Sequence, residues 1–172
     1  KKGGGAFAAD YDAYTLRCIF GDNSATLTGG GVYGVRTHLA IITNNFAQDG
    51  GGASDASFGT CLFSGNVATN RGGAVCEGNL DSCTVAGNSA GNEGGGISGA
   101  AANYSIIYHN SAPLYPNCDT NSAVADSCTT PSSGFNNFTN DPAFANLATG
   151  DYHLSSNSLC INYLYSPNPS DP

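Results

Sequence analysis

The stretch Cys61-Leu-Phe63-Ser-Gly-Asn66-Val-Ala68 contains a hexapeptide, Phe63 to Ala68, with an apolar residue first, Asn fourth and Ala last. This hexapeptide occurs five times, and its asparagines are separated by 22, 21, 22 and 22 residues. A fixed period in this range is the sequence signature of a repeat architecture. The copies begin at Phe20, Ile42, Phe63, Val85 and Ile107, and their asparagines are Asn23, Asn45, Asn66, Asn88 and Asn110.

Two further markers run in phase with this hexapeptide. Two residues before each apolar anchor stands a small residue: Cys18, Ala40, Cys61, Cys83 or Ser105. A Gly-Gly pair followed by a small apolar residue also recurs, and its second glycines are Gly5, Gly31, Gly52, Gly73 and Gly96. Gly and Asn tolerate a positive φ, so we expect tight corners at these glycines and asparagines.

Short segments between these corners alternate apolar and polar residues, as strands do, and no persistent helical period is present. One unit of this length cannot close a core alone, but stacked units bury their inward residues as columns. We therefore predict an all-β fold, a right-handed single-stranded parallel β-helix with five regular rungs and an irregular C-terminal turn and cap. The expected columns are Ala6/Val32/Ala53/Ala74/Ile97, Cys18/Ala40/Cys61/Cys83/Ser105, Phe20/Ile42/Phe63/Val85/Ile107 and an internal amide ladder of Asn23/Asn45/Asn66/Asn88/Asn110.

The regular pattern covers residues 1–112 and ends before a proline-containing segment. Residues 113–164 are expected to form an irregular rung, a polar loop closed by a Cys118–Cys128 disulfide, and a cap of the same domain. Two strand-like pieces, Asp151–Leu154 and Leu159–Leu164, are expected to cover the C-terminal end of the stack. Residues 165–172 are predicted to be a proline-rich, extended tail.

The first 112 residues resemble the β-helix repeats of bacterial and chlamydial polymorphic outer membrane proteins, whose pattern is Gly-Gly-Ala-Ile followed by Phe-x-x-Asn. The segment Asp141–Asn162 resembles the terminal motif of secreted, often surface-anchored bacterial β-helix proteins, with Asp141-Pro-Ala-Phe144, Gly150-Asp-Tyr-His-Leu154 and Ser158-Leu-Cys-Ile-Asn162. It departs from that motif at Leu159, where the family has Pro, and at Asn162, where it has Asp. The resemblance implies the fold and carries little information about activity.

The composition restricts the class of function. A net charge of −8 excludes nucleic acid as a partner, because that partner needs a basic surface. No apolar stretch is long enough to span a membrane. Seven cysteines in a chain with only 10% charged residues favour an oxidising compartment, so we predict an extracellular or cell-surface location. Asn103-Tyr-Ser105 and Asn137-Phe-Thr139 match the N-glycosylation pattern and are candidate sites.

The leading hypothesis is a non-catalytic structural or adhesive protein without a metal or cofactor. The repeat begins at Gly3 with no visible cap, so self-association into a filament or surface layer, or contact with neighbouring domains, is expected. The first alternative is a polysaccharide-active enzyme, a pectate-lyase-like protein or glycoside hydrolase, with candidate charges Asp55, Glu77, Arg36 and Arg71. The second is a carbohydrate-binding module that uses exposed aromatic residues: Tyr11, Tyr14, Tyr33, Tyr104, Tyr108 and Tyr115.

Overall fold

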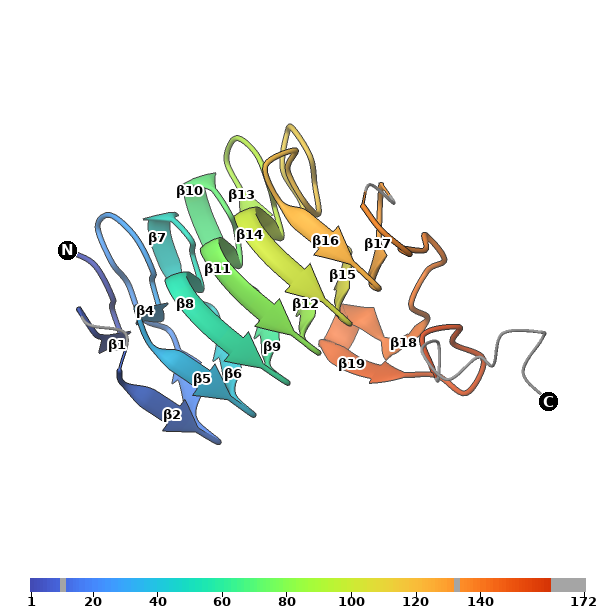
Figure 1. Ribbon diagram of the computed structural model, residues 1–172, viewed down its shortest axis with the longest axis horizontal. Helices are drawn as coiled ribbons and strands as arrows, with labels where there is room; N and C mark the ends of the chain where they lie inside the picture. Colours follow the sequence, from blue (N-terminus) through green and yellow to red (C-terminus); the bar gives the residue numbers. More distant parts are fainter. Residues whose placement is uncertain (10–11, 132–133, 162–172) are drawn as a thin grey trace.

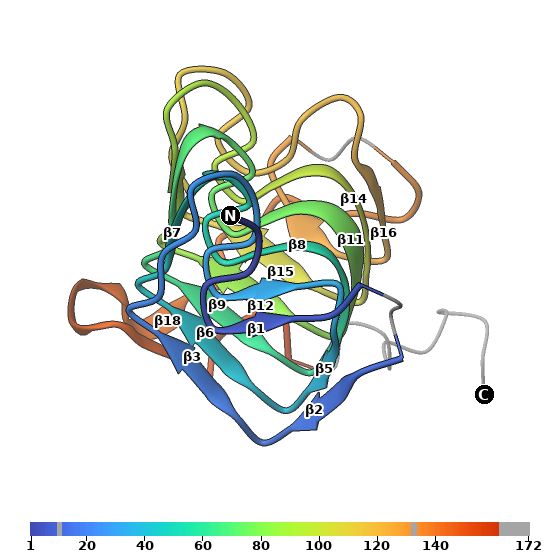
Figure 2. The same ribbon diagram turned by 90° about the vertical axis from the view of Figure 1, so that its left-hand side faces the viewer.

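Short strands follow one another around the faces of a coil, and each pairs in parallel with the strand one period later. The computed structural model describes residues 1–9, 12–131 and 134–161. Six stacked turns run from one end to the other (Figure 1). The view along the axis shows the strands grouped on separate sides of one coil (Figure 2). This confirms the predicted parallel β-helix.

Three parallel sheets form the sides. The eight-stranded sheet contains β1 (Ala6–Phe7), β2 (Tyr14–Leu16), β4 (Val32–Tyr33), β5 (Arg36–His38), β8 (Ala53–Gly59), β11 (Val75–Asp81), β14 (Ile97–Asn103) and β16 (Ala123–Ala125). The six-stranded sheet contains β3 (Ile19–Gly21), β6 (Ile41–Thr43), β9 (Leu62–Ser64), β12 (Thr84–Ala86), β15 (Ile106–Tyr108) and β17 (Cys128–Thr129). The three-stranded sheet contains β7 (Phe46–Asp49), β10 (Val67–Arg71) and β13 (Ser89–Ala90).

Inward side chains form the expected columns, with one correction of register. The column of Ile42, Phe63, Val85 and Ile107 is fully buried and lies in register across the six-stranded sheet. In the eight-stranded sheet, Val75 pairs with Ala53 and Ile97, so Val75 occupies the place predicted for Ala74. The cause is that the third glycine of the Gly-Gly-Gly run at residues 50–52 is replaced by Ala74 one turn later.

The C-terminal region departs from the predicted cap. The two strands of a hairpin, β18 (Phe144–Asn146) and β19 (Asp151–Leu154), are joined by a 3-10 turn, η1 (Leu147–Thr149). The residues 150–153 face Leu62 and Thr84, so the hairpin lies beside the six-stranded sheet and not across the end of the stack.

The end of the stack is covered by a further partial turn. In it, Phe135 bridges to Ala125 and Phe138 bridges to Cys128. Leu159–Ile161 form a turn instead of the expected strand. The rest of that strand and the predicted tail at 165–172 lie outside the described residues.

Candidate functional site

The most regular polar feature is the column of ladder asparagines inside the coil. Asn45, Asn66 and Asn88 are at most 1% exposed. From Asn23 to Asn88, each Nδ2 donates to the Oδ1 of the next asparagine at 2.9–3.1 Å. That Oδ1 also accepts the backbone N–H of the preceding asparagine at 3.0 Å. Each ladder amide therefore joins two turns and satisfies buried groups that would otherwise be costly.

Asn117 ends this ladder and carries no repeat marker. Its Oδ1 accepts from the backbone N–H of Asn110 at 3.2 Å and from its Nδ2 at 3.1 Å. Its own Nδ2 donates to Thr130 Oγ1 at 2.8 Å and to the Thr130 carbonyl at 3.1 Å. Asn117 thus serves as a sixth asparagine of the ladder and comes from a different point of the turn, which is why periodicity could not find it.

A second polar column contains thiols and hydroxyls. The Cys83 Sγ accepts the backbone N–H of Cys61 at 3.5 Å, and the Ser105 Oγ accepts that of Cys83 at 3.0 Å. Ser127 continues this column, since its Oγ accepts the N–H of Ser105 at 3.0 Å. Asn137 ends it, because its Oδ1 accepts the N–H of Ser127 at 2.9 Å. Both polar columns therefore terminate in an asparagine.

The corners that lead into both columns are built in the same way. A residue with positive φ comes first, and at most of these corners the next side chain donates to the carbonyl two residues back, as Ser105 does to Asn103 and Asn110 does to Tyr108. The exceptions are Ala40, which has no donor, and Asn45 and Asn66, which donate to carbonyls of the preceding turn. The positive φ thus falls on the residue before each ladder asparagine, not on the asparagine as predicted. No repeated marker indicates the other corner, whose positive-φ residues are Arg17, Leu39, Thr60, Ser82, Tyr104 and Asp126.

The marker glycines make room for the ladder rather than turning the chain. In the glycine runs, the positive φ falls on an earlier glycine, such as Gly50 or Gly94. A Cβ on Gly52 would lie 3.0 Å from the amide carbon of Asn66. Gly5, Gly31 and Gly96 are placed against ladder asparagines in the same way. Gly73 leaves less room: its Cβ would lie 2.1 Å from the backbone oxygen of Gly95, whereas a Cβ on Gly52 would lie 2.7 Å from that of Ala74.

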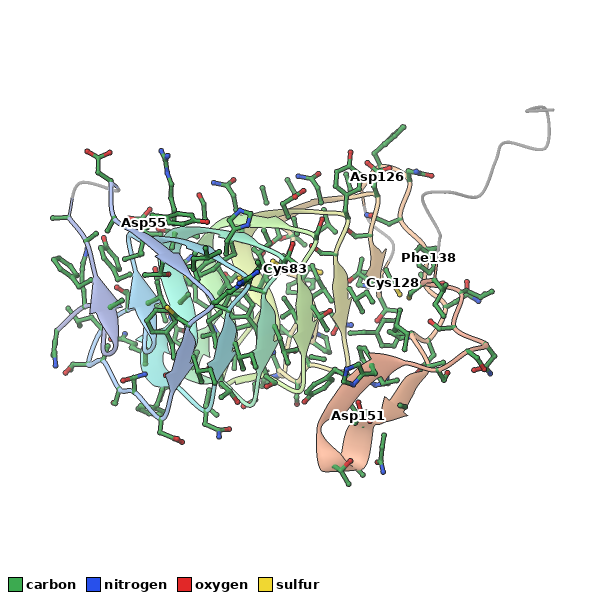
Figure 3. The ribbon with its side chains drawn as sticks, turned by 90° about the horizontal axis from the view of Figure 1, so that it is seen from below. Asp55, Cys83, Asp126, Cys128, Phe138 and Asp151 are labelled. Atoms are coloured by element: carbon green, nitrogen blue, oxygen red, sulfur yellow. The ribbon has the colours of Figure 1, made fainter. Side chains whose placement is uncertain are left out.

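The predicted Cys118–Cys128 disulfide is not formed in the structure, where all seven cysteines are free thiols. Cys118 points into the stack, with its Sγ 3.1 Å from Thr129 Oγ1, and burial raises its pKa to about 11. Cys128, labelled in Figure 3, contacts Cys160 instead. Burial likewise raises the pKa of Cys76 to about 12. Sequence spacing suggested a local pair, whereas the coil directs the two sulfur atoms to different partners.

The two glycosylation candidates have different surroundings. Asn103 is exposed at the end of β14. The Nδ2 of Asn137, the atom that would carry a glycan, donates to the carbonyl of Val124 at 2.8 Å. A glycan on Asn137 would disrupt the residue that ends the second polar column.

Three of the candidate catalytic charges, Arg36, Asp55 and Glu77, lie on the eight-stranded sheet, where Figure 3 labels Asp55. The fourth, Arg71, is the last residue of β10 in the three-stranded sheet. Arg71 lies between two acids, with Nη2 3.1 Å from Glu77 Oε1 and Nε 3.6 Å from Asp49 Oδ1. Asp55 accepts a hydrogen bond from the Tyr33 hydroxyl at 3.1 Å. The structure thus gives the two acids different partners, an arginine and a phenol.

A shallow groove of about 400 Å³ runs along the same face. Its lining includes Arg36, so this arginine is apart from the Arg71 ion pairs. Tyr14 is 57% exposed in the groove, and its ring centroid is 6.2 Å from that of His38. Of the other aromatic candidates, Tyr33 stacks on Phe7, Tyr104 and Tyr115 are exposed, Tyr108 bonds the Thr139 carbonyl, and Tyr11 lies outside the described residues.

Two histidines that the sequence left without a role are paired with aspartates. His109 Nε2 is 3.1 Å from Asp141 Oδ2, and its ring is near that of Phe144, so it fastens the hairpin to the six-stranded sheet. His153 Nδ1 is 2.6 Å from Asp151 Oδ1, and this hydrogen bond lowers the pKa of Asp151. Among the described residues, His, Cys, Asp and Glu side chains form no group of three or more arranged to hold a metal ion. That part of the chain also contains no helix long and apolar enough to cross a membrane.

The comparisons with known proteins agree with the architecture. A family model described as the Chlamydia polymorphic membrane protein repeat matches residues 60–76. These residues contain the Phe63-to-Asn66 corner and the following glycine pair, the features on which the resemblance rested. Comparisons with curated proteins and with solved structures gave no match.

Proposed function

We propose that this chain is a structural or adhesive β-helix segment of a cell-surface protein and is exposed outside the cell. The observation that carries the proposal is the use of the repeated polar side chains in bonds between turns. A regular rod of stacked turns offers long outer faces for contact. The match of residues 60–76 to the repeat of a membrane protein family supports a surface location.

The surroundings of the acidic residues favour this role over polysaccharide cleavage. Glycoside cleavage uses two carboxylates that flank one bond, with one held as the acid. Here Glu77 is bound to Arg71, and Asp55 accepts a bond from Tyr33. Incubation with pectins, alginates and neutral glucans tests the alternative. We expect no new reducing ends, and cleavage that is lost in Glu77→Gln would replace the structural proposal.

Glycan binding is a second candidate, and the groove around Tyr14 favours it. An exposed tyrosine beside polar side chains can stack on a sugar ring while those side chains bond its hydroxyls. The measurement is a glycan array followed by titration calorimetry of any bound sugar. Tyr14→Ala should abolish binding at this groove, whereas Tyr115→Ala should retain it because Tyr115 lies in a loop outside the groove. Equal loss in both variants would place binding elsewhere.

Association of copies into a filament or surface layer is the finer part of the structural proposal. Support comes from the outer faces of the first turns, where Phe7, Leu16 and Ile19 are 56%, 49% and 72% exposed. Exposed apolar surface of this kind favours contact with another protein surface. Sedimentation velocity of the full chain tests it, with Ile19→Lys as the variant and Thr69→Lys as the exposed control. Concentration-dependent assembly that Ile19→Lys weakens is expected, and a single monomeric species at all concentrations would contradict it.

A further inference from the structure

Two thiols meet at the C-terminal end of the stack. Cys128 is in β17, is 1% exposed, and donates from its Sγ to the carbonyl oxygen of Asn140 at 3.1 Å. The Cys160 side chain is its neighbour, and the interaction between the two is the first cause of the raised pKa of Cys128. Cys160 follows the hairpin and is partly exposed. The pair therefore combines a sulfur fixed in the last turn with one that solvent reaches.

Hydrogen bonds within the C-terminal segment (residues 141–161) hold Cys160 in this place. Its backbone N–H donates to Ser158 Oγ at 3.2 Å, and that hydroxyl donates to the Pro142 carbonyl at 2.5 Å. The backbone N–H of Ser155 donates to the carbonyl of Ala143 at 2.9 Å. Because residues 140–143 follow directly from the last turn, these bonds bring Cys160 back to β17.

We propose that Cys128 and Cys160 are a disulfide site that joins the C-terminal segment to the last turn of the β-helix. The bond would close a loop that contains the whole β18–β19 hairpin. Since this hairpin lies beside the six-stranded sheet, the disulfide would hold it there. This pairing replaces the one that spacing suggested for Cys118 and Cys128.

The bond forms by exchange with a small-molecule disulfide such as glutathione disulfide. The interaction with the Cys128 side chain lowers the pKa of Cys160, so Cys160 supplies the attacking thiolate. It forms a mixed disulfide and expels one thiol. Cys128 then loses its proton and attacks the Cys160 sulfur, which expels the second thiol. Two protein thiols are oxidised by two electrons, and one small-molecule disulfide is reduced to two thiols.

Cys61 and Cys83 provide an internal control. They are also neighbours, in adjacent turns of the second polar column, where the Cys61 backbone N–H donates to Cys83 Sγ at 3.5 Å. Both are buried, with exposures of 3% and 2%, so a dissolved oxidant does not reach them in the folded protein. The proposal therefore requires one pair to react and the other to remain reduced.

The test is disulfide mapping of the folded 172-residue chain after exposure to glutathione disulfide and alkylation. Cleavage before aspartate separates the three relevant thiols, because Cys128 falls in peptide 126–140, Cys160 in 151–170 and Cys118 in 81–118. We expect peptides 126–140 and 151–170 to be joined by a bond that a reductant cleaves. A link to peptide 81–118, glutathione carried singly on Cys160, or no oxidation of either thiol would overturn the proposal.

Two variants and a second readout show what the bond does. Cys160→Ser should abolish the link and leave the circular dichroism spectrum unchanged, whereas Cys18→Ser, at another partly exposed thiol, should retain the link. Oxidation should slow hydrogen exchange at the Ser155 amide at least about tenfold, since the closed loop restricts opening of the segment. Loss of the link in Cys18→Ser, or unchanged exchange after oxidation, would contradict the assignment.

Discussion

The regular turns and the C-terminal region use the same hydrogen bonds in different ways. In the regular turns, each ladder asparagine from Asn23 to Asn88 bonds the asparagine one period later, so the same bond is repeated along the axis. In the C-terminal region, single residues accept the hydrogen bonds that a further regular turn would otherwise accept. Asn117 and Asn137 end the two polar columns, and each comes from an irregular stretch. A repeat thus needs particular residues to end it, and those residues lack a period by which they could be recognised.

The largest effect is expected from removing a central ladder amide. Asn66→Ala leaves the backbone and side-chain N–H groups of Asn45 without their acceptor and removes the donor to the Ile42 carbonyl. Several buried groups lose partners at once, so we expect a loss of about 4 kcal/mol in the free energy of unfolding. Urea denaturation measures it. Asn79→Ala, on the exposed face of β11, is the control and should change stability by less than about 0.5 kcal/mol. Similar midpoints for both variants would refute the ladder's role.

The marker glycines of two neighbouring turns, Gly52 and Gly73, should differ in their tolerance of a side chain. Gly73→Ala places a Cβ against the backbone oxygens of Gly95 and Ser89, whereas Gly52→Ala introduces the residue that Ala74 already provides one turn later. We expect a loss of about 3 kcal/mol for Gly73→Ala and about 1 kcal/mol for Gly52→Ala. Thermal and urea unfolding of the pair give the comparison, and the reverse order would mean that the corrected register is wrong.

A smaller and local effect is expected at the end of the ladder. Asn117→Ala leaves the backbone N–H of Asn110 without its acceptor, at a cost of about 2 kcal/mol. The side-chain amide of Asn110 keeps the Val85 and Tyr108 carbonyls as acceptors. Hydrogen exchange should show lost protection at the Asn110 amide, while the Asn45 amide, several turns away, stays protected. Uniform loss along all turns would show that Asn117 acts on the whole fold rather than as a terminator.

The smallest effect is expected in the second polar column. Cys83→Ser keeps a group that accepts from Cys61 and donates to the Asp81 carbonyl, as Ser105 does at the equivalent place. We expect a cost of about 1 kcal/mol or less, against about 2 kcal/mol for Cys83→Val, which removes both bonds. If Cys83→Val is more stable than Cys83→Ser, the cysteines of this column contribute only apolar packing.

The sequence predicted what is repeated and missed what occurs once. Five asparagines in phase were enough to predict the fold and an internal amide ladder. The predicted register at Ala74 was wrong. It aligned Gly72-Gly73 with the last two glycines of the run at residues 50–52, whereas the structure aligns this pair with the first two. The corner at Arg17, Leu39 and Tyr104 was missed because these side chains show no preference for positive φ. After Arg17 and Tyr104, the following Cys18 or Ser105 donates the bond that holds the corner.

The candidate site could be predicted less well than the fold. Asp55 and Glu77 were placed on one face correctly, since adjacent turns bring residues 22 apart together. Their partners could not be foreseen, because Arg71 reaches Glu77 from the preceding strand and Tyr33 reaches Asp55 from the preceding turn. The contact of Cys128 with Cys160 depends on how the hairpin folds back, and no repeat specifies that path.

Hydrogen exchange at the backbone amides of Asn45, Asn66 and Asn88 tests most directly whether the repeated polar side chains are architecture. Each of these N–H groups has a side-chain oxygen of the next turn as its acceptor. If the ladder holds the turns together, these three amides are among the slowest in the protein, at least about a thousandfold slower than in an unfolded chain. Exchange as fast as that of exposed loop amides would contradict the account.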